Sequence, residues 1–249
     1  MQPVLLSNGL TIDSVDVMSG KVGHLCLDYA PRDRNLLDLL NAGEDVVALL
    51  NASNGGELTL ATATALIKMG RVPALLGQPE GTWFDAKEKH FDLASDRGKI
   101  SLAQSVARFC NGDEGGIVVV GLKTSTPHGT EVVDRLTPVD FDPSMAPRYR
   151  KIIDQYLYPF PAGLKITAVP TADNKGMFML VEVPPQPDYH KPFLVAGAIV
   201  DDKVYGGFIS IVQRRDENSE PLKPAMIHSW IAAGRALVQR GKLPGDARP

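Results

Sequence analysis

The sequence predicts a domain that mixes α-helices and β-strands, and three observations support this class. The run 117–122 is continuous, apolar and rich in β-branched residues, which is typical of a strand buried on both faces. Apolar residues at helical spacing after Ser101 (Leu102, Val106 and Phe109) predict an amphipathic helix. Further short apolar runs predict strands at 164–170, 177–184, 193–200 and 208–212.

Residues 1–76 predict a small α/β module of unknown role. Two extended segments, at 11–17 and 24–29, are followed by leucines at helical spacing after Asp33 and by a second helix that ends at Gly70. The Gly- and Pro-containing stretch 70–81 predicts a linker or a loop between modules.

The region that follows begins with an alternating segment. Trp83, Asp85 and Lys87 alternate with apolar neighbours, which predicts a short strand over 82–87 with one solvent-exposed face. After the core strand, a helix is expected over 147–157 and ends before two prolines. An amphipathic helix over 225–240 is expected to close the region.

Composition excludes several classes of protein. Hydrophobic residues at 44% and charged residues at 22% are ordinary for a globular chain of 249 residues, and no apolar run approaches the roughly 18 residues needed to span a bilayer. The N-terminal residues lack the features of a secretory signal, so a cytoplasmic location and no membrane partner are expected. The two cysteines and five histidines lack zinc-site spacing, and no nucleotide-binding P-loop motif occurs. With a net charge of −3, any binding of nucleic acid requires a local basic surface.

Four short motifs occur in a fixed order along the second region. They are EGTWFDAK at 80–87, FCNGDEGG at 109–116, VEVP at 181–184 with KPF at 191–193, and QRRDENS at 213–219. This set resembles the Schlafen AlbA-type, or divergent AlbA-like, domain family over residues 78–232. The resemblance implies an α+β fold with a mixed, mainly antiparallel sheet and flanking helices. Outside the resemblance, the module 1–76 precedes this domain, and a helix end and tail at 233–249 follow it.

The same resemblance implies an acidic site. Glu80 and Asp85 are candidate catalytic residues and candidate ligands for Mg²⁺ or Mn²⁺, because hard divalent ions bind carboxylate oxygens and activate water. Lys87, two residues after Asp85, is a third candidate catalytic residue that could neutralise phosphate charge. Nuclease-competent Schlafen proteins carry another acid at the position of Lys123, and a lysine there favours phosphate binding over catalysis.

Basic residues from separate segments are the candidate nucleic-acid contacts. They are Lys87, Lys89, Lys99, Arg108, Lys123, Arg148, Arg150, Lys151, Arg214 and Arg215. If several converge in the fold, they could follow a phosphate backbone. Aromatic residues that could stack on bases are Trp83, Phe84, Tyr149, Tyr156 and Tyr158. The expected partner is tRNA or another structured RNA, or DNA.

Three functions stay open at the level of the sequence. The first is nucleic-acid binding through the phosphate backbone, and the second adds Mg²⁺- or Mn²⁺-dependent endonuclease activity. The third is a catalytically silent protein-interaction or scaffold module, with a protein partner or a homo-oligomer. The glycines of the 109–116 motif are expected to stop a helix, with an anion-binding loop as the alternative.

Overall fold

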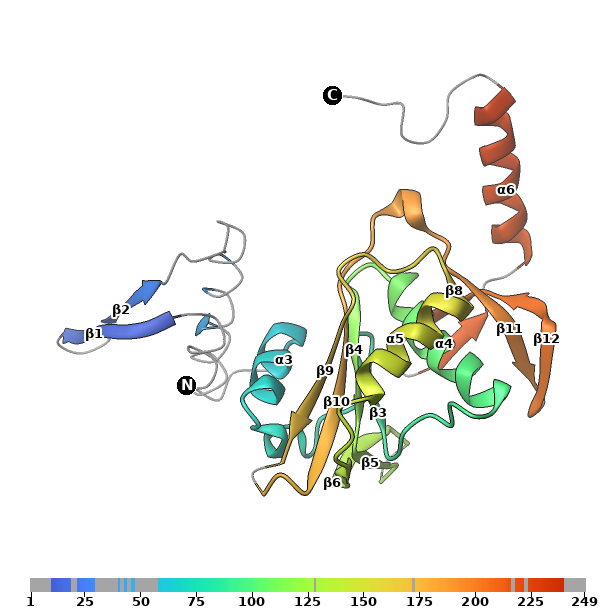
Figure 1. The fold of residues 1–249 in the computed structure, drawn as a ribbon. Helices are drawn as coiled ribbons and strands as arrows, with labels where there is room; N and C mark the ends of the chain where they lie inside the picture. Colours follow the sequence, from blue (N-terminus) through green and yellow to red (C-terminus); the bar gives the residue numbers. More distant parts are fainter. Residues whose placement is uncertain are drawn as a thin grey trace. The chain divides into compact units, whose positions relative to one another are not determined.

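The computed structural model divides the chain into two compact units, Met1–Gln78 and Pro79–Pro249 (Figure 1). It describes residues 10–18, 22–29, 40, 43, 46–47, 58–127, 129–171, 173–215, 218–221 and 224–239.

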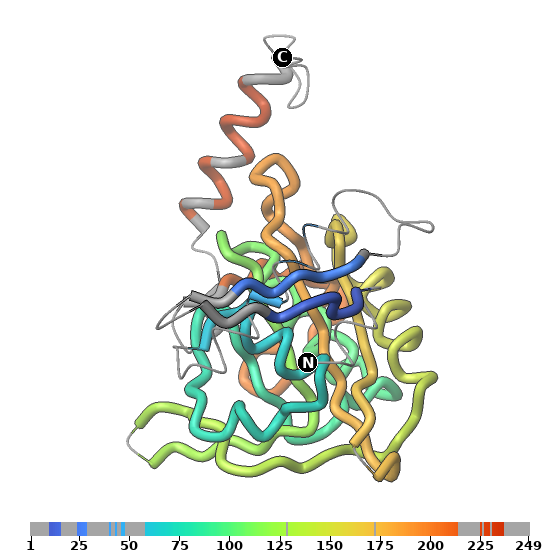
Figure 2. Tube along the Cα trace, turned by 90° about the vertical axis from the view of Figure 1, so that its left-hand side faces the viewer, coloured from blue at the N-terminus to red at the C-terminus, as the bar shows by residue number. Residues whose placement is uncertain are grey.

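The first unit contains a β-hairpin and a short helix. Strands β1 (Leu10–Met18) and β2 (Val22–Tyr29) pair antiparallel, which confirms both predicted extended segments (Figure 2). Helix α3 (Leu60–Lys68) begins where the Thr59 side chain caps it, and a 3-10 turn, η1 (Val72–Leu75), follows. The helix predicted after Asp33 lies largely outside the described residues.

The main sheet of the second unit is mixed. Strand β3 (Phe84–Lys87) lies at one edge and runs parallel to β4 (Gly116–Val120). The other pairings are antiparallel: β4 pairs with β10 (Gly176–Val183), which also pairs with β7 (Val139–Asp140) and β9 (Lys165–Pro170). All five residues of β4 are buried, as the apolar run predicts. The predicted α+β class with a mainly antiparallel sheet is therefore confirmed.

Two helices cover one face of this sheet. Helices α4 (Asp96–Cys110) and α5 (Met145–Tyr156) contact each other and share a hydrophobic core with alternate residues of β4 and β10 (Figure 1). The sequence predicts the start of α4 at Ser101, but the helix begins one turn earlier. Its N-cap is Ser95, whose Oγ accepts a hydrogen bond from the Gly98 backbone N–H at 3.1 Å.

Smaller elements complete the second unit. A three-stranded sheet has the order β12 (Lys203–Ser210), β11 (Leu194–Val200) and β8 (Leu157–Tyr158). Two hairpins, a 3-10 turn and a helix remain: β5 (Leu122–Ser125) with β6 (Val132–Leu136), β13 (Val212–Arg215) with β14 (Asn218–Pro221), η2 (Asp188–His190) and α6 (Pro224–Gln239). Within the described residues, every helix is too short or too polar to cross a membrane.

Candidate functional site

Asp85 is buried, and this corrects the expectation of a solvent-exposed face on the first strand of the second unit. In β3 it lies opposite Val118 of β4, on the face that α4 covers, and its exposed fraction is 0%. The alternation along β3 is real, but both faces of the strand are covered at this point. Lys87, at the end of the strand, keeps a third of its side chain exposed.

Two cations hold the Asp85 carboxylate. Its Oδ1 accepts a hydrogen bond from Lys87 Nζ at 2.8 Å, and its Oδ2 lies 2.5 Å from Nη2 of Arg108. Arg108 is itself 8% exposed and donates from Nε to the Ser105 carbonyl. The three side chains together carry a net charge of +1, with the negative charge innermost.

From the sequence, Arg108 is predicted only as one of the basic residues that could contact nucleic acid. A signal was present, because Arg108 stands between the apolar residues Ala107 and Phe109 in the last turns of α4, all of which are buried. A buried arginine needs an acidic partner, and Asp85 supplies it.

Glu80 lies beside the same strand. Only 6% of the residue is exposed, and its Oε1 accepts a hydrogen bond from the Ala86 backbone N–H at 2.9 Å. The Glu80 backbone N–H donates to the Glu131 carbonyl at 2.8 Å, which fixes the segment before β3. The structure therefore places the Lys87 ammonium on the Asp85 carboxylate and the Glu80 carboxylate on the backbone of the same strand.

The two acids do not fit a divalent cation in this arrangement. Mg²⁺ and Mn²⁺ require carboxylate oxygens that face the ion, whereas both oxygens of Asp85 face cationic side chains. One oxygen of Glu80 is engaged by backbone. In the part of the chain that the structure describes, no three His, Cys, Asp or Glu side chains are grouped to hold a metal ion.

Several of the candidate basic residues gather near the C-terminal end of β3. Lys89 follows Lys87 by two residues and is exposed. Lys123 of β5 lies on the same end of the sheet, because its Nζ pairs with Oε1 of Glu88 at 3.3 Å. Lys87, Lys89 and Lys123 therefore come together from two separate segments.

His90 joins this end of β3 to α5. Its Nδ1 lies 2.9 Å from the Tyr149 hydroxyl, which also accepts a hydrogen bond from the Phe91 backbone N–H at 3.3 Å. Burial lowers the pKa of His90, and the nearby cation Arg148 lowers it further, while Asp142 acts in the opposite direction. Burial also shifts the pKa of the Tyr149 hydroxyl, which it raises. The link joins the segment after β3 to α5, on which Arg148 is exposed and close enough to His90 to lower its pKa.

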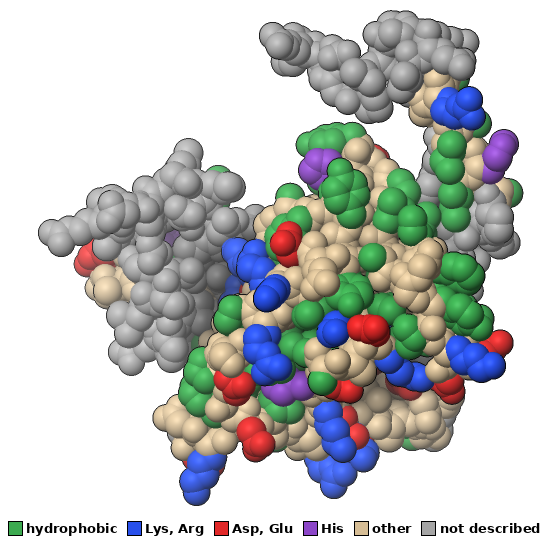
Figure 3. Space-filling view, turned by 45° about the vertical axis from the view of Figure 1, so that its right-hand side comes forward, with side chains coloured by type: hydrophobic (Ala, Val, Ile, Leu, Met, Phe, Trp, Pro, Cys, Tyr) green, Lys and Arg blue, Asp and Glu red, His purple; other side chains and the backbone are tan. Residues whose placement is uncertain are grey.

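The remaining candidate basic residues are less closely grouped. Lys151 is exposed on α5, whereas Arg150 donates to the Leu164 carbonyl at 2.8 Å and lies over the Phe160 ring. The backbones of Arg214 and Arg215 lie in β13, but their side chains are outside the described set. Figure 3 shows blue basic side chains with red acidic ones between them, so the face in this view carries a mixture of charges.

The 109–116 motif has a structural role. Asn111 is buried, its Oδ1 accepts from the Phe193 backbone N–H at 2.7 Å, and its Nδ2 donates to the carbonyls of Phe193 and Val212 at 3.1 and 2.9 Å. Gly115 has a φ of 72°, and a Cβ there would lie 2.3 Å from the Val183 carbonyl oxygen. The motif ends α4 and attaches the helix end to the starts of β11 and β13. Within it, Cys110 packs in the core, as a buried thiol whose pKa burial raises.

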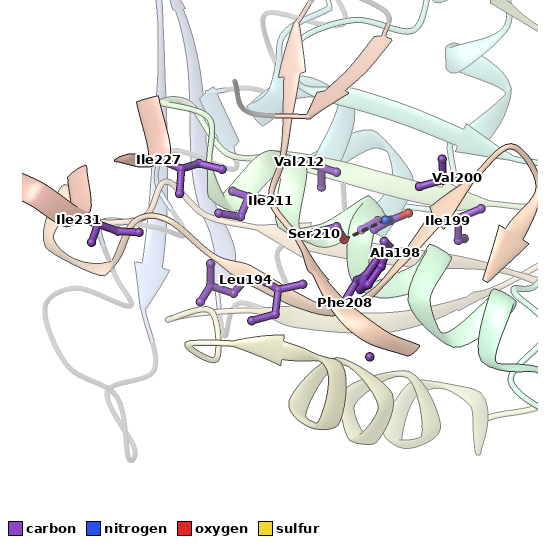
Figure 4. Close-up of a pocket in the computed structure, with 13 residues that line it drawn as sticks. Leu194, Ala198, Ile199, Val200, Phe208, Ser210, Ile211, Val212, Ile227 and Ile231 are labelled. Atoms are coloured by element: carbon purple, nitrogen blue, oxygen red, sulfur yellow. Dashed lines mark hydrogen bonds between the residues drawn. The ribbon is translucent and has the colours of Figure 1, made fainter. Parts of the chain in front are cut away.

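The structure also contains an apolar groove, which the sequence reasoning missed. It has a volume of about 1060 Å³, and none of its 13 lining residues is charged (Figure 4). The lining includes Leu194, Ile199, Phe208, Ile227 and Ile231, from β11, β12 and α6. Figure 3 shows hydrophobic side chains gathered beside α6.

Comparisons with known proteins give no family. No protein-family model matches the chain. No curated protein matches it either. Two of the solved structures to which the chain is similar each have a TM-score of 0.36. One is the DIP2311 protein from Corynebacterium diphtheriae, at 14% identity, with 61% of this chain and 24% of that chain covered. The other is the N-terminal domain of a protein from Nitrosomonas europaea described as related to the ATP-dependent DNA helicase RecG, at 18% identity, with 47% of this chain and 71% of that chain covered. The chain thus spans about a quarter of the length of the first and less than three quarters of the second.

Proposed function

We propose that this protein binds nucleic acid through the phosphate backbone, at a surface formed by the end of β3, β5 and the first turns of α5. We name this surface the cationic edge and define it by Lys87, Lys89, Lys123, Arg148 and Lys151. The observation that carries the proposal is that contacts join the three segments that bear these cations. The ion pair between Lys123 and Glu88 joins the first two segments, and the contact between His90 and Tyr149 joins the third.

The ion pairs inside the edge favour phosphate as the ligand. Lys87 Nζ is held by Asp85 Oδ1 and by the Ala86 carbonyl, at 2.8 and 3.1 Å, so its position is fixed before a ligand arrives. A lysine ammonium has three N–H donors, and these two contacts leave one for a phosphate oxygen. Contacts of this kind set register and affinity but carry no base sequence.

The test is binding of labelled tRNA, duplex DNA and single-stranded DNA, measured by fluorescence anisotropy over a range of salt concentrations. We expect the affinity to fall as the salt concentration rises. Each neutralised phosphate of duplex DNA contributes about −0.9 to the slope of the logarithm of the binding constant against the logarithm of the salt concentration. The Lys89→Glu, Arg148→Glu double variant should bind at least about tenfold more weakly and reduce the slope by about two. The matched control is Lys203→Glu, an exposed lysine of β12 away from the edge. Absence of binding at low salt, or equal loss in the control, contradicts the proposal.

Metal-dependent cleavage stays a prediction of the motif resemblance, and we propose no metal-dependent step. With Mn²⁺ present, we expect retention of the nucleic acid without cleavage, because Asp85 is already neutralised by Lys87 and Arg108. Cleavage that EDTA abolishes and that the Glu80→Ala, Asp85→Ala variant lacks would overturn this expectation. That result would establish the endonuclease instead.

A second candidate function is protein interaction, which the apolar groove favours. An uncharged groove of this size is normally covered in a working protein. The occupant we propose is a second copy of the chain, because a groove with apolar walls and exposed apolar rims, such as Phe208 at 58% and Ile231 at 59%, can pair with itself about a two-fold axis. Light scattering should then show a dimer in the wild type and a monomer in Ile231→Asp. A monomeric wild type at the highest soluble concentration contradicts this candidate.

A further inference from the structure

The structure separates the aromatic residues that could stack on bases. Phe84 and Tyr149 are fully buried, and Trp83 and Tyr156 are half-buried. Tyr158 alone of the five is strongly exposed, at 74%. It lies in β8, directly after α5.

The exposed side of α5 leads from the cationic edge toward Tyr158. Arg148, Lys151 and Gln155 follow at i, i+3 and i+7, and all three are exposed. The buried side of the helix, which includes Tyr149, faces the core. From Arg148 to the end of α5 at Tyr156 the helix advances eight residues, or about 12 Å, and Tyr158 lies two residues further on in β8.

The backbone of Tyr158 is fixed. Leu157 is buried, and Tyr158 pairs with Leu194 across the β8–β11 ladder. A ring presented on fixed backbone costs little entropy when a ligand covers it, because a tyrosine has only two side-chain torsions. This placement is the geometry that a stacking platform needs.

We propose that the ligand of the cationic edge includes a single-stranded segment, one base of which stacks on Tyr158 while its phosphates follow the polar side of α5. This inference rests on the proposed function and names its substrate class. The length of about 12 Å from Arg148 to the end of α5 accommodates about three to four nucleotides at the ~3.4 Å spacing of a stacked strand. Stacking favours single strands, because their bases offer a free face whereas those of a duplex interior are stacked on one another.

The experiment compares a labelled 20-nucleotide single strand with the duplex of the same length, at one low salt concentration. The variants are Tyr158→Ala, which removes the ring, and Tyr158→Phe, which keeps it. Tyr205→Ala is the matched control, because Tyr205 is also exposed but lies in β12, on the other side of β11 from β8. Thermal melts confirm that each variant is folded.

We expect Tyr158→Ala to bind the single strand about tenfold more weakly while duplex binding changes less than twofold. Tyr158→Phe and Tyr205→Ala should bind as the wild type does. Unchanged single-strand binding by Tyr158→Ala, or equal loss for the duplex, overturns the inference. In that case, weaker binding of nucleic acid by the Lys89→Glu, Arg148→Glu variant still supports the proposed function. A wild type that binds neither the single strand nor the duplex contradicts both the proposed function and this inference.

Discussion

The ion pair between Asp85 and Arg108 makes a quantitative prediction about stability. The Asp85 side chain is 1% exposed and that of Arg108 is 10% exposed, so water cannot replace either partner. Removing Arg108 with Arg108→Met leaves the carboxylate with Lys87 alone, whose ammonium lies partly in solvent. Breaking a buried pair costs about 3 to 5 kcal/mol, and the remaining lysine puts the expected loss near the lower end, at about 3 kcal/mol.

The measurement is urea unfolding at pH 7, followed by far-UV circular dichroism and by tryptophan fluorescence. A loss of about 3 kcal/mol corresponds to a fall in melting temperature of about 6 to 12 °C for a unit of this size. The double variant Asp85→Val, Arg108→Met replaces both charges by apolar side chains. We expect it to be more stable than either single variant, because no buried charge is left without a partner.

The control is the exposed pair of Arg97 and Asp202. These side chains are 52% and 86% exposed, and solvent screening limits the effect of Arg97→Met to about 1 kcal/mol or less. The reasoning is refuted if Arg108→Met costs no more than Arg97→Met. It is equally refuted if the losses of the two single variants simply add in the double variant.

Three further predictions concern residues that hold the same unit together. Asn111→Ala should lower the unfolding free energy by about 3 kcal/mol, because it leaves buried backbone groups of Phe193 without partners; a loss below about 1 kcal/mol in urea unfolding contradicts this. Gly98→Ala should destabilise the fold by about 1 to 3 kcal/mol, because a Cβ at this position would lie 2.0 Å from the Asp92 carbonyl oxygen. Alanine normally favours a helix over glycine, so a raised melting temperature would show that the clash does not occur. Burial lowers the pKa of His90 in the folded state, so the unfolded chain binds a proton more readily and the stability of the fold falls as the pH drops below about 6.5. In His90→Gln, the melting temperature should therefore depend less on pH between about 5 and 7. An unchanged dependence shows that His90 does not cause the loss of stability.

Much of the fold follows from local patterns in the sequence. The run at 117–122 identifies β4, because only a strand covered on both faces places five consecutive apolar residues in a core. Strands β9, β10 and β11 and helices α5 and α6 also lie where periodicity predicts them. The short strands β5, β6 and β8 were not predicted, because two to five residues carry too little pattern and their pairing depends on distant segments.

The sequence gives no sign of the electrostatics around the candidate residues. The motif spacing identifies Glu80, Asp85 and Lys87 as neighbours. Alternation along β3 cannot reveal that α4 covers the side bearing Asp85, since that depends on the packing of a helix that begins later in the chain. Burial and the partner Arg108 are therefore tertiary facts, and they change a candidate metal ligand into a member of an ion pair.

The contacts of Asn111 bear on how the second unit folds. Its hydrogen-bond partners, Phe193 and Val212, lie 82 and 101 residues further along the chain. One side chain thus closes two long loops, so the end of α4, the start of β11 and the start of β13 gain their bonds in a single event. These segments should open together or not at all, and the amide proton of Phe193 should exchange with solvent as slowly as those in the centre of β4.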